Sequence, residues 1–139
     1  MDLIKLKESI VKHEGKRLKP YKDTVGKLTI GVGRNLDDVG ITYDECDYML
    51  NNDIQRVFRE ARGQDWWDAV SDNDARSRAM VELLFNVGGA TLAKFKHALA
   101  ALRNRDYGRA ADEFLDSLWA KQVGARAITI TKMIRNGTD

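Results

Sequence analysis

Two carboxylates nine residues apart, Glu14 and Asp23, are side chains suited to acid–base chemistry. Glu14 closes an amphipathic pattern four residues beyond Ile10, so we expect it on the half-buried face of a helix. Burial of this kind favours the protonated form of a carboxyl group. Asp23 instead has polar and basic neighbours, which favour the ionised form. One protonated and one ionised carboxyl group form the pair that cleavage of a glycosidic bond requires.

A hydroxyl group joins this pair in the segment that follows. Its glycine-punctuated pattern predicts a β-hairpin. If the loop centres on Gly26 with an odd number of residues, Asp23 lies opposite Thr29 on one face. A carboxylate and a hydroxyl can then hold one water, as an inverting glycosidase needs. The sequence therefore predicts Glu14 as general acid, Asp23 as base or electrostatic partner, and Thr29 as the residue that orients the water.

A resemblance to a known family is carried by the segment HEGKRLKPYKDTVGKLTIGVG, residues 13–33, with its Glu-x8-Asp-x5-Thr spacing. It closely resembles the phage-type lysozymes, the endolysin family (glycoside hydrolase family 24) that includes the lysozyme of T-even phages. The similarity covers nearly the whole chain and extends to Phe85-Asn86 with Gly88, the stretch 95–119, Arg126 and Asn136-Gly137. The resemblance implies that Glu14, Asp23 and Thr29 are catalytic, and that Arg126 is the helix-borne arginine that pairs with the glutamate.

The family resemblance also implies a fold and an activity. The fold is α+β and mainly helical, a lysozyme-like arrangement in one catalytic domain of residues 1–139. A small β lobe, about 15–40, is joined by a long helix to a helical lobe, about 65–139, that includes the N-terminal helix. The implied activity is that of an endolysin or muramidase, which cuts the bond between N-acetylmuramic acid and N-acetylglucosamine in peptidoglycan.

Three further residues are predicted to contact the substrate: Arg34, Phe85 and Asn86. Two departures from the family pattern affect this cleft. Arg34 stands where the best-known member has a histidine, and the segment Asn35–Gly40 is much shorter than its counterpart. Asn86 has a second interpretation, because its amide could instead satisfy the polar groups of a buried helix end.

The elements that must position these residues have clear boundary signals. Thr42-Tyr-Asp-Glu45 is a capping box that opens a helix to about Arg62. An apolar segment, residues 79–87, is capped by Ser71 or Asp74 and ended by Gly88-Gly89, and we expect it to be the central core helix. It contains a further carboxylate, Glu82, expected to be exposed or paired. Helices follow at about 91–102, with Thr91 as cap, at 107–119 and at 125–135, where Asn136-Gly137 ends the last one. Arg126 opens the last of these, an unfavourable place for a cation in the helix dipole and a hint that it pairs elsewhere.

Composition limits the classes of function. The 139 residues, 43% hydrophobic and 32% charged, are typical of one soluble globular domain. The net charge of +2 hides a basic excess, since residues 1–34 carry nine Lys or Arg against four Asp or Glu. Such a surface attracts an anionic polymer, peptidoglycan or nucleic acid. No helix concentrates the basic residues as a recognition helix would, so we expect no nucleic-acid partner.

We expect neither a metal nor a cofactor. Cys46 is the only cysteine, and His13 and His97 lack ligand spacing. The charged N-terminus has no apolar run suited to a signal peptide or a membrane span. We therefore expect a monomer made in the host cytoplasm that reaches the wall from the periplasmic side. A holin or another release step would first permeabilise the membrane.

Two other functions fit parts of the sequence. A lytic transglycosylase also uses a glutamate acid but needs no held water. A non-catalytic wall-binding module of a virion would keep the fold and tolerate loss of Glu14, Asp23 or Thr29, all of which are present. The sequence leaves open whether the protein is a free endolysin or virion-associated, which wall chemotype and host it meets, and what Cys46 does.

Overall fold

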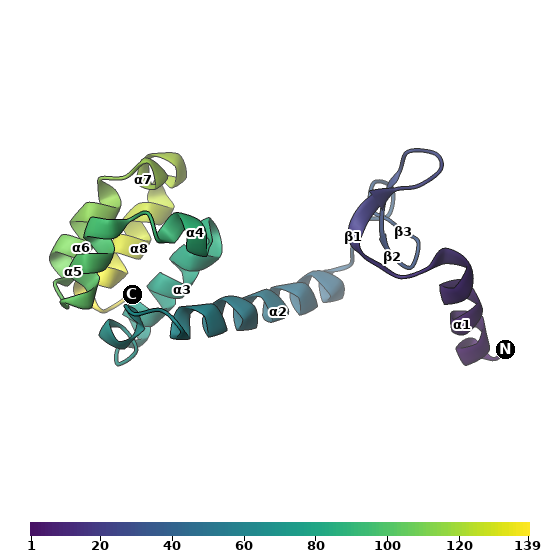
Figure 1. Ribbon diagram of the computed structural model, residues 1–139, viewed down its shortest axis with the longest axis horizontal. Helices are drawn as coiled ribbons and strands as arrows, with labels where there is room; N and C mark the ends of the chain where they lie inside the picture. Colours follow the sequence, from purple (N-terminus) through teal and green to yellow (C-terminus); the bar gives the residue numbers. More distant parts are fainter. The chain divides into compact units, whose positions relative to one another are not determined.

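The chain folds into eight α-helices and one small antiparallel sheet, which confirms the predicted mainly helical α+β class (Figure 1). The computed structural model describes all 139 residues. The chain divides into two compact units, Met1–Met49 and Leu50–Asp139, here called the sheet unit and the helical unit. The predicted assignment of the N-terminal helix to the helical lobe stays a prediction.

The sheet unit begins with helix α1 (Leu3–Glu14), which Asp2 caps by accepting hydrogen bonds from the Ile4 and Lys5 N–H groups at 3.0 and 3.1 Å. Three strands follow: β1 (Arg17–Lys22), β2 (Leu28–Gly31) and β3 (Arg34–Asn35). Their order is β1-β2-β3, and both pairings are antiparallel. The end of α1 is therefore only two residues from an edge strand.

Helix α2 (Tyr43–Arg62) leads along the chain from the sheet unit into the helical unit (Figure 1). The Glu45 N–H donates to Thr42 Oγ1 at 3.2 Å, and the Thr42 N–H donates to Glu45 Oε1 at 2.9 Å. These reciprocal bonds confirm the predicted capping box and the predicted start of the helix. Cys46 is a free, exposed thiol on the first turns of α2.

The helical unit contains the rest of α2, a short 3-10 helix η1 (Trp67–Ala69) and six further helices. In chain order these are α3 (Asp74–Val87), α4 (Gly89–Leu92), α5 (Lys96–Arg103), α6 (Tyr107–Leu115), α7 (Leu118–Val123) and α8 (Ala125–Asn136). Helix α6 packs against α5 and α8, and α3 packs against α8 (Figure 1). No helix in the chain combines the length and hydropathy needed to span a membrane.

The apolar core lies entirely in the helical unit. Helix α3 contributes Ala79, Met80, Leu83 and Leu84 to it, which confirms the prediction of a core helix ended by Gly88. The largest fully buried side chains are Trp66, Phe114, Met80, Leu83, Leu84, Leu102, Ile130, Ile134 and Val70. This core fixes the helices that carry Phe85, Asn86 and Arg126.

Several predicted helix boundaries are wrong because polar side chains cap the backbone at other places. Asn73, rather than Ser71 or Asp74, caps α3 by accepting the Arg76 N–H at 2.9 Å. The predicted helix 107–119 breaks near Ser117, whose hydroxyl accepts the Ala120 N–H at 3.2 Å and starts α7. The predicted helix 91–102 breaks between α4 and α5, so Thr91 lies inside α4 instead of capping a helix.

Candidate active site

Glu14 is the last residue of α1, which Gly15 ends. The Gly15 N–H donates to the Val11 carbonyl at 2.8 Å, and its φ of 77° is a conformation that glycine adopts readily. Within the sheet unit Glu14 is exposed, and its predicted half-burial in the whole chain stays a prediction. Three apolar residues of α1 are also exposed: Leu3 by 65%, Leu6 by 43% and Ile10 by 44%. Within the sheet unit, Val32 is the one residue outside α1 that lines the groove beside these side chains, so the groove stays open.

Asp23 organises the loop that follows β1. Its Oδ1 accepts the N–H groups of Val25 at 3.0 Å and Lys27 at 2.8 Å. Its own N–H donates to the Lys27 carbonyl at 2.9 Å. One carboxylate oxygen is therefore engaged with the backbone, while Oδ2 receives no hydrogen bond and can accept one from a ligand or water.

Thr29 is buried, with 4% of its surface exposed, and pairs with Tyr21 instead of Asp23. The predicted direct pairing is therefore wrong: the loop centres on Val25, because the Asp23 side chain closes it against Lys27. Moving the centre by one residue moves the register by two, and a shift of two keeps the face. Asp23 itself lies in the loop just beyond β1, so its relation to Thr29 is given by their contacts with Lys27.

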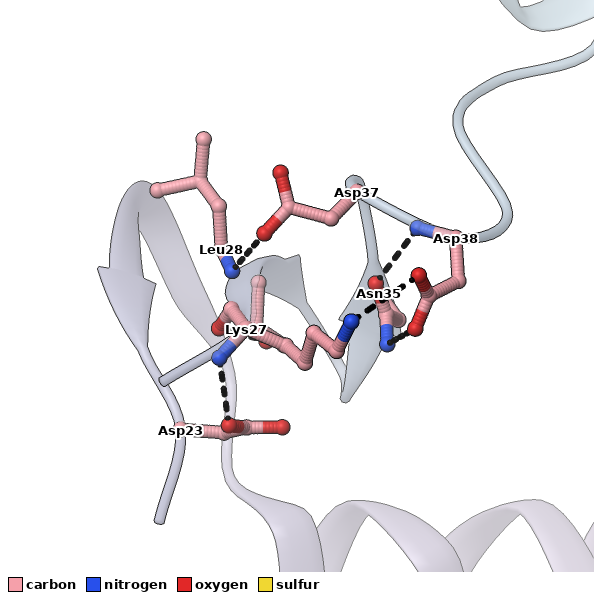
Figure 2. Close-up of polar contacts among 7 residues, drawn as sticks. Asp23, Lys27, Leu28, Asn35, Asp37 and Asp38 are labelled. Carbon is pink, nitrogen blue, oxygen red and sulfur yellow. Dashed lines mark hydrogen bonds and ion pairs between the residues drawn. The ribbon is translucent and has the colours of Figure 1, made fainter. Parts of the chain in front are cut away.

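Lys27, which no sequence pattern pointed to, connects these two residues. Its N–H donates to Asp23 Oδ1, and its carbonyl accepts the Thr29 hydroxyl at 2.9 Å. Figure 2 shows the Asp23 carboxylate beside the backbone of Lys27. The structure therefore brings Asp23 and Thr29 to a shared backbone partner. The signal available in the sequence was the tendency of an Asp to bond to the N–H groups of a following turn.

The short loop Asn35–Gly40 is anchored to the hairpin by its carboxylates (Figure 2). Asp37 Oδ2 accepts the Leu28 N–H at 2.8 Å. Asp38 Oδ1 forms an ion pair with Lys27 Nζ at 3.2 Å. These two contacts hold the loop against the start of β2, next to the residues that bind Asp23.

Arg34, on β3, links the sheet to α2. Its Nη1 donates to Glu45 Oε1 at 2.7 Å and to the Gly40 carbonyl at 3.2 Å. The hydrogen bond from the Arg34 guanidinium, followed by that from the Thr42 N–H, lowers the pKa of Glu45 to about 2. Glu45 therefore has two roles, as capping residue and as the partner of Arg34. Contact between Arg34 and substrate stays a prediction.

Arg126 lies in the first turn of α8 and forms an ion pair with Glu82 on α3, with Nε and Oε1 3.2 Å apart. The prediction that Glu82 is exposed or paired is confirmed, since its side chain retains 50% exposure within the pair. A carboxylate at this position also offsets the unfavourable charge of Arg126 at a helix N-terminus. Glu14 belongs to the other unit, so its pairing with Arg126 stays a prediction.

Phe85, one turn after Glu82, is 42% exposed and lines a groove of about 700 Å³ in the helical unit. The groove is mostly apolar, and it also includes the Arg126 and Glu82 side chains. An exposed ring beside an apolar groove can pack against the face of a sugar. The substrate-binding role of Phe85 stays a prediction.

Asn86 is fixed by the helical unit. Its Oδ1 accepts the indole N–H of Trp119 at 2.7 Å, and Trp119 is 5% exposed. The amide therefore satisfies a buried donor on α7, which is close to the structural interpretation of Asn86 in the sequence analysis. The Asn86 NH₂ group is left to donate, so the predicted contact with substrate stays a prediction.

The chemistry available from these residues is acid–base. The sheet unit carries two carboxylates and a buried hydroxyl, and the helical unit carries a cation, a ring and an amide. No three His, Cys, Asp or Glu side chains in the structure are grouped as a metal site requires.

The chain is similar to several known proteins. Residues 11–135 match the family model described as phage lysozyme. The endolysin of Salmonella phage P22 is 32% identical over 79% of this chain and 77% of its own length. The probable T4-type lysozyme 2 of Dictyostelium discoideum is 24% identical over 96% of this chain and 95% of its own length. The pre-baseplate central spike protein Gp5 of Enterobacteria phage T4 is 28% identical over 94% of this chain, but the chain spans only 27% of that protein.

Proposed function

Because the chain belongs to the phage lysozyme family, we propose that it hydrolyses the β-1,4 bond between N-acetylmuramic acid and N-acetylglucosamine in peptidoglycan. The family makes it a glycoside hydrolase of the lysozyme type. Relatives that are named endolysins support lysis of a bacterial host as the purpose of the reaction. The roles of individual residues are part of the proposal.

In the proposed reaction, Glu14 donates a proton to the leaving glycosidic oxygen as the bond to the anomeric carbon breaks. A water attacks the opposite face of the sugar ring, and Asp23 accepts its proton or stabilises the developing positive charge. Thr29 orients this water. Attack from the opposite face inverts the anomeric configuration of the product.

The observation that carries this proposal is the shared bonding of Asp23 and Thr29 to Lys27. The Thr29 hydroxyl uses its single proton on the Lys27 carbonyl, so its oxygen offers only lone pairs to other groups. Asp23 Oδ2 is likewise an acceptor. Two acceptors on one face can receive both protons of one water, which leaves a lone pair of the water oxygen free for attack.

The other predicted residues would hold the polymer and the acid. Arg126 is proposed to pair with Glu14 and fix its orientation. Arg34, Phe85 and Asn86 are proposed to contact the glycan through their remaining guanidinium donors, the ring face and the amide NH₂ group. The basic excess of residues 1–34 would attract the carboxylates of the peptide stems.

The test of the acid is Glu14→Gln, assayed on purified peptidoglycan. An amide cannot deliver a proton, and general acid catalysis contributes about 10²–10⁴-fold, so turnover should fall by at least that range. Glu8→Gln, an exposed glutamate on the same helix, is the matched control and should keep wild-type turnover. A Glu14→Gln enzyme with more than about a tenth of wild-type turnover would exclude Glu14 as the acid and would favour a non-catalytic wall-binding module.

Product analysis separates hydrolysis from transglycosylation. Hydrolysis leaves a free reducing end, with inverted configuration if a water attacks as proposed. A lytic transglycosylase would leave an anhydro terminus, lighter by one water. Mass spectrometry of the released muropeptides, with proton NMR of the newly formed anomer, should show the reducing and inverted product. Anhydro ends as the main product would overturn the proposal.

We also propose that the protein acts as a monomer on the wall from the periplasm, after a holin or an equivalent step permeabilises the membrane. In that case, expression inside a Gram-negative host should be tolerated until the inner membrane is damaged, and lysis should then be fast. Lysis of intact expressing cells would show that the protein reaches the wall unaided.

A further inference from the structure

The turn between β2 and β3 contains a glycine that touches the side chain of Glu14. Gly33 has a φ of +70°, and a Cβ built on it would lie 3.1 Å from both Cδ and Oε2 of Glu14. These separations are shorter than ordinary van der Waals contact between heavy atoms. The Glu14 carboxyl therefore lies directly against the Gly33 backbone, in space that a side chain would take.

A second glycine in the same segment provides a comparison. Gly31 has the same φ of +70°, but a Cβ built on it would meet no heavy atom within 4 Å. Both positions favour glycine for their backbone conformation. Only at Gly33 does the missing side chain also make room for a carboxylate.

We propose that Gly33 is a positioning residue, whose bare backbone forms the surface against which the carboxyl group of Glu14 is held. The proposal rests on the proposed role of Glu14 as the general acid. Glu14 is at an exposed helix end, where its long side chain would otherwise sample several rotamers. A surface that limits these rotamers brings the acid closer to one reactive geometry.

The turn itself is held firmly enough to serve as such a surface. Ile30 and Arg34 pair across it as antiparallel partners. Arg34 is bonded in turn to Glu45 and the Gly40 carbonyl. The Gly33 backbone is thus tied to both the sheet and the start of α2, while Glu14 reaches it from α1.

The test compares Gly33→Ala with Gly31→Ala in the full chain. Both variants force alanine into the same left-handed conformation, so both should lose a similar amount of melting temperature. Only Gly33→Ala should displace the acid, and its kcat on peptidoglycan should fall by about tenfold with little change in KM. Gly31→Ala should stay within about threefold of wild-type kcat.

A second readout reports the contact without relying on activity. A methyl group against the carboxyl displaces water and favours its protonated form. In protein labelled with ¹³C at the glutamate side-chain carboxyl, the titration midpoint of Glu14 should therefore rise in Gly33→Ala and stay unchanged in Gly31→Ala. The limb of the pH–activity curve that Glu14 sets should move upward with it.

Asparagine variants keep the test usable if the alanine variants fold poorly, because asparagine tolerates positive φ better than alanine does. Gly33→Asn should reproduce the loss of kcat and the altered titration, and Gly31→Asn should not. Equal kcat and equal Glu14 titration in the matched pairs would overturn the proposal. If Glu14→Gln proved active, the proposed function would fail instead, while the titration would still show whether Gly33 positions the carboxyl.

Discussion

In the sheet unit, Thr29 is the one buried residue, and side chains as apolar as Leu18 are exposed by 90%. In the helical unit, by contrast, a continuous core encloses Trp66 and Phe114, exposed by 1% and 0%. Burial of apolar area supplies most of the free energy of folding. Taken by itself, the helical unit therefore gains more from apolar burial, whereas the contacts within the sheet unit are mainly hydrogen bonds and ion pairs.

This difference matches the chemistry proposed for each unit. Apolar contacts are non-directional, whereas hydrogen bonds fix both distance and direction. The side chains of Asp23 and Thr29 must be held in fixed directions, and hydrogen bonds to the Lys27 backbone do this for both. A carboxylate that must meet water and substrate also cannot be buried in an apolar core without cost. Substitutions should therefore separate stability from turnover according to the unit in which they fall.

The largest effect is expected for Leu83→Ala, in the core of the helical unit. Leu83 is 0% exposed, and removing such a side chain costs about 2–5 kcal/mol in the free energy of unfolding. Turnover per folded molecule should be unchanged, because Leu83 is not among the proposed site residues. Denaturant unfolding and assays at a temperature where the variant is folded would measure both quantities.

Leu18→Ala is the matched change in the sheet unit. Leu18 is 90% exposed, so its truncation should change the free energy of unfolding by no more than about 0.5 kcal/mol. A loss comparable to that of Leu83→Ala would mean that the sheet unit depends on apolar burial around Leu18, contrary to the comparison above.

The next effect is on turnover and concerns Thr29→Val. Valine keeps the shape and strand propensity but deletes the hydroxyl. The Lys27 carbonyl keeps the Asp23 N–H, so the loss of stability should be only about 1 kcal/mol. Turnover should fall by about tenfold or more if the hydroxyl orients the water.

The helical unit offers a closely matched control, Thr131→Val. Thr131 is 2% exposed, and its hydroxyl donates to the Ala127 carbonyl at 2.7 Å. The same chemical change should therefore lower stability and leave turnover per folded molecule intact. Equal turnover in the two valine variants would show that Thr29 has a structural role only.

The same contrast explains what could be predicted from the sequence. The Thr42 capping box and the helix ends at Gly88 and Gly137 depend on residues within one turn, and these were predicted correctly. The pairing of Thr29 with Tyr21 depends on how the Asp23 side chain closes the loop, which a strand pattern does not encode. The shared face of Asp23 and Thr29 stays a prediction, because Asp23 lies in the loop beyond β1.

Contacts between residues that are far apart in the sequence could not be predicted from local sequence patterns. Arg126 and Glu82 are separated by 44 positions, and only the packing of α3 against α8 brings them together. The contact of Gly33 with Glu14 is similar, because it depends on how the end of α1 meets a turn. The glycine signal was visible in the sequence, but its partner was not.

A smaller effect is expected for Arg126→Ala, which tests whether this residue of the helical unit affects the acid–base chemistry of Glu14 in the sheet unit. A nearby guanidinium favours the ionised form of a carboxyl group. Without it, the limb of the pH–activity curve that Glu14 sets should move upward. Glu82→Gln, which removes the observed partner of Arg126 and keeps the arginine, should leave that limb in place. A profile of Arg126→Ala that superimposes on wild type would show that the two residues are not coupled.

The smallest effect is on stability in acid and concerns Glu45, the partner of Arg34 in the sheet unit. The Arg34 hydrogen bond holds the pKa of Glu45 near 2, below its ordinary value of 4.5. A carboxyl whose pKa is lowered by folding stabilises the protein above its unfolded pKa and loses that contribution as the pH falls through the folded value. Glu45→Gln keeps a capping acceptor without the charge. The difference in melting temperature between wild type and Glu45→Gln should therefore be full above about pH 4.5 and should vanish near pH 2. Added salt should reduce it, because the pair is exposed to solvent. A difference that stays constant from pH 7 to pH 2 would mean that Glu45 acts through its capping bond alone.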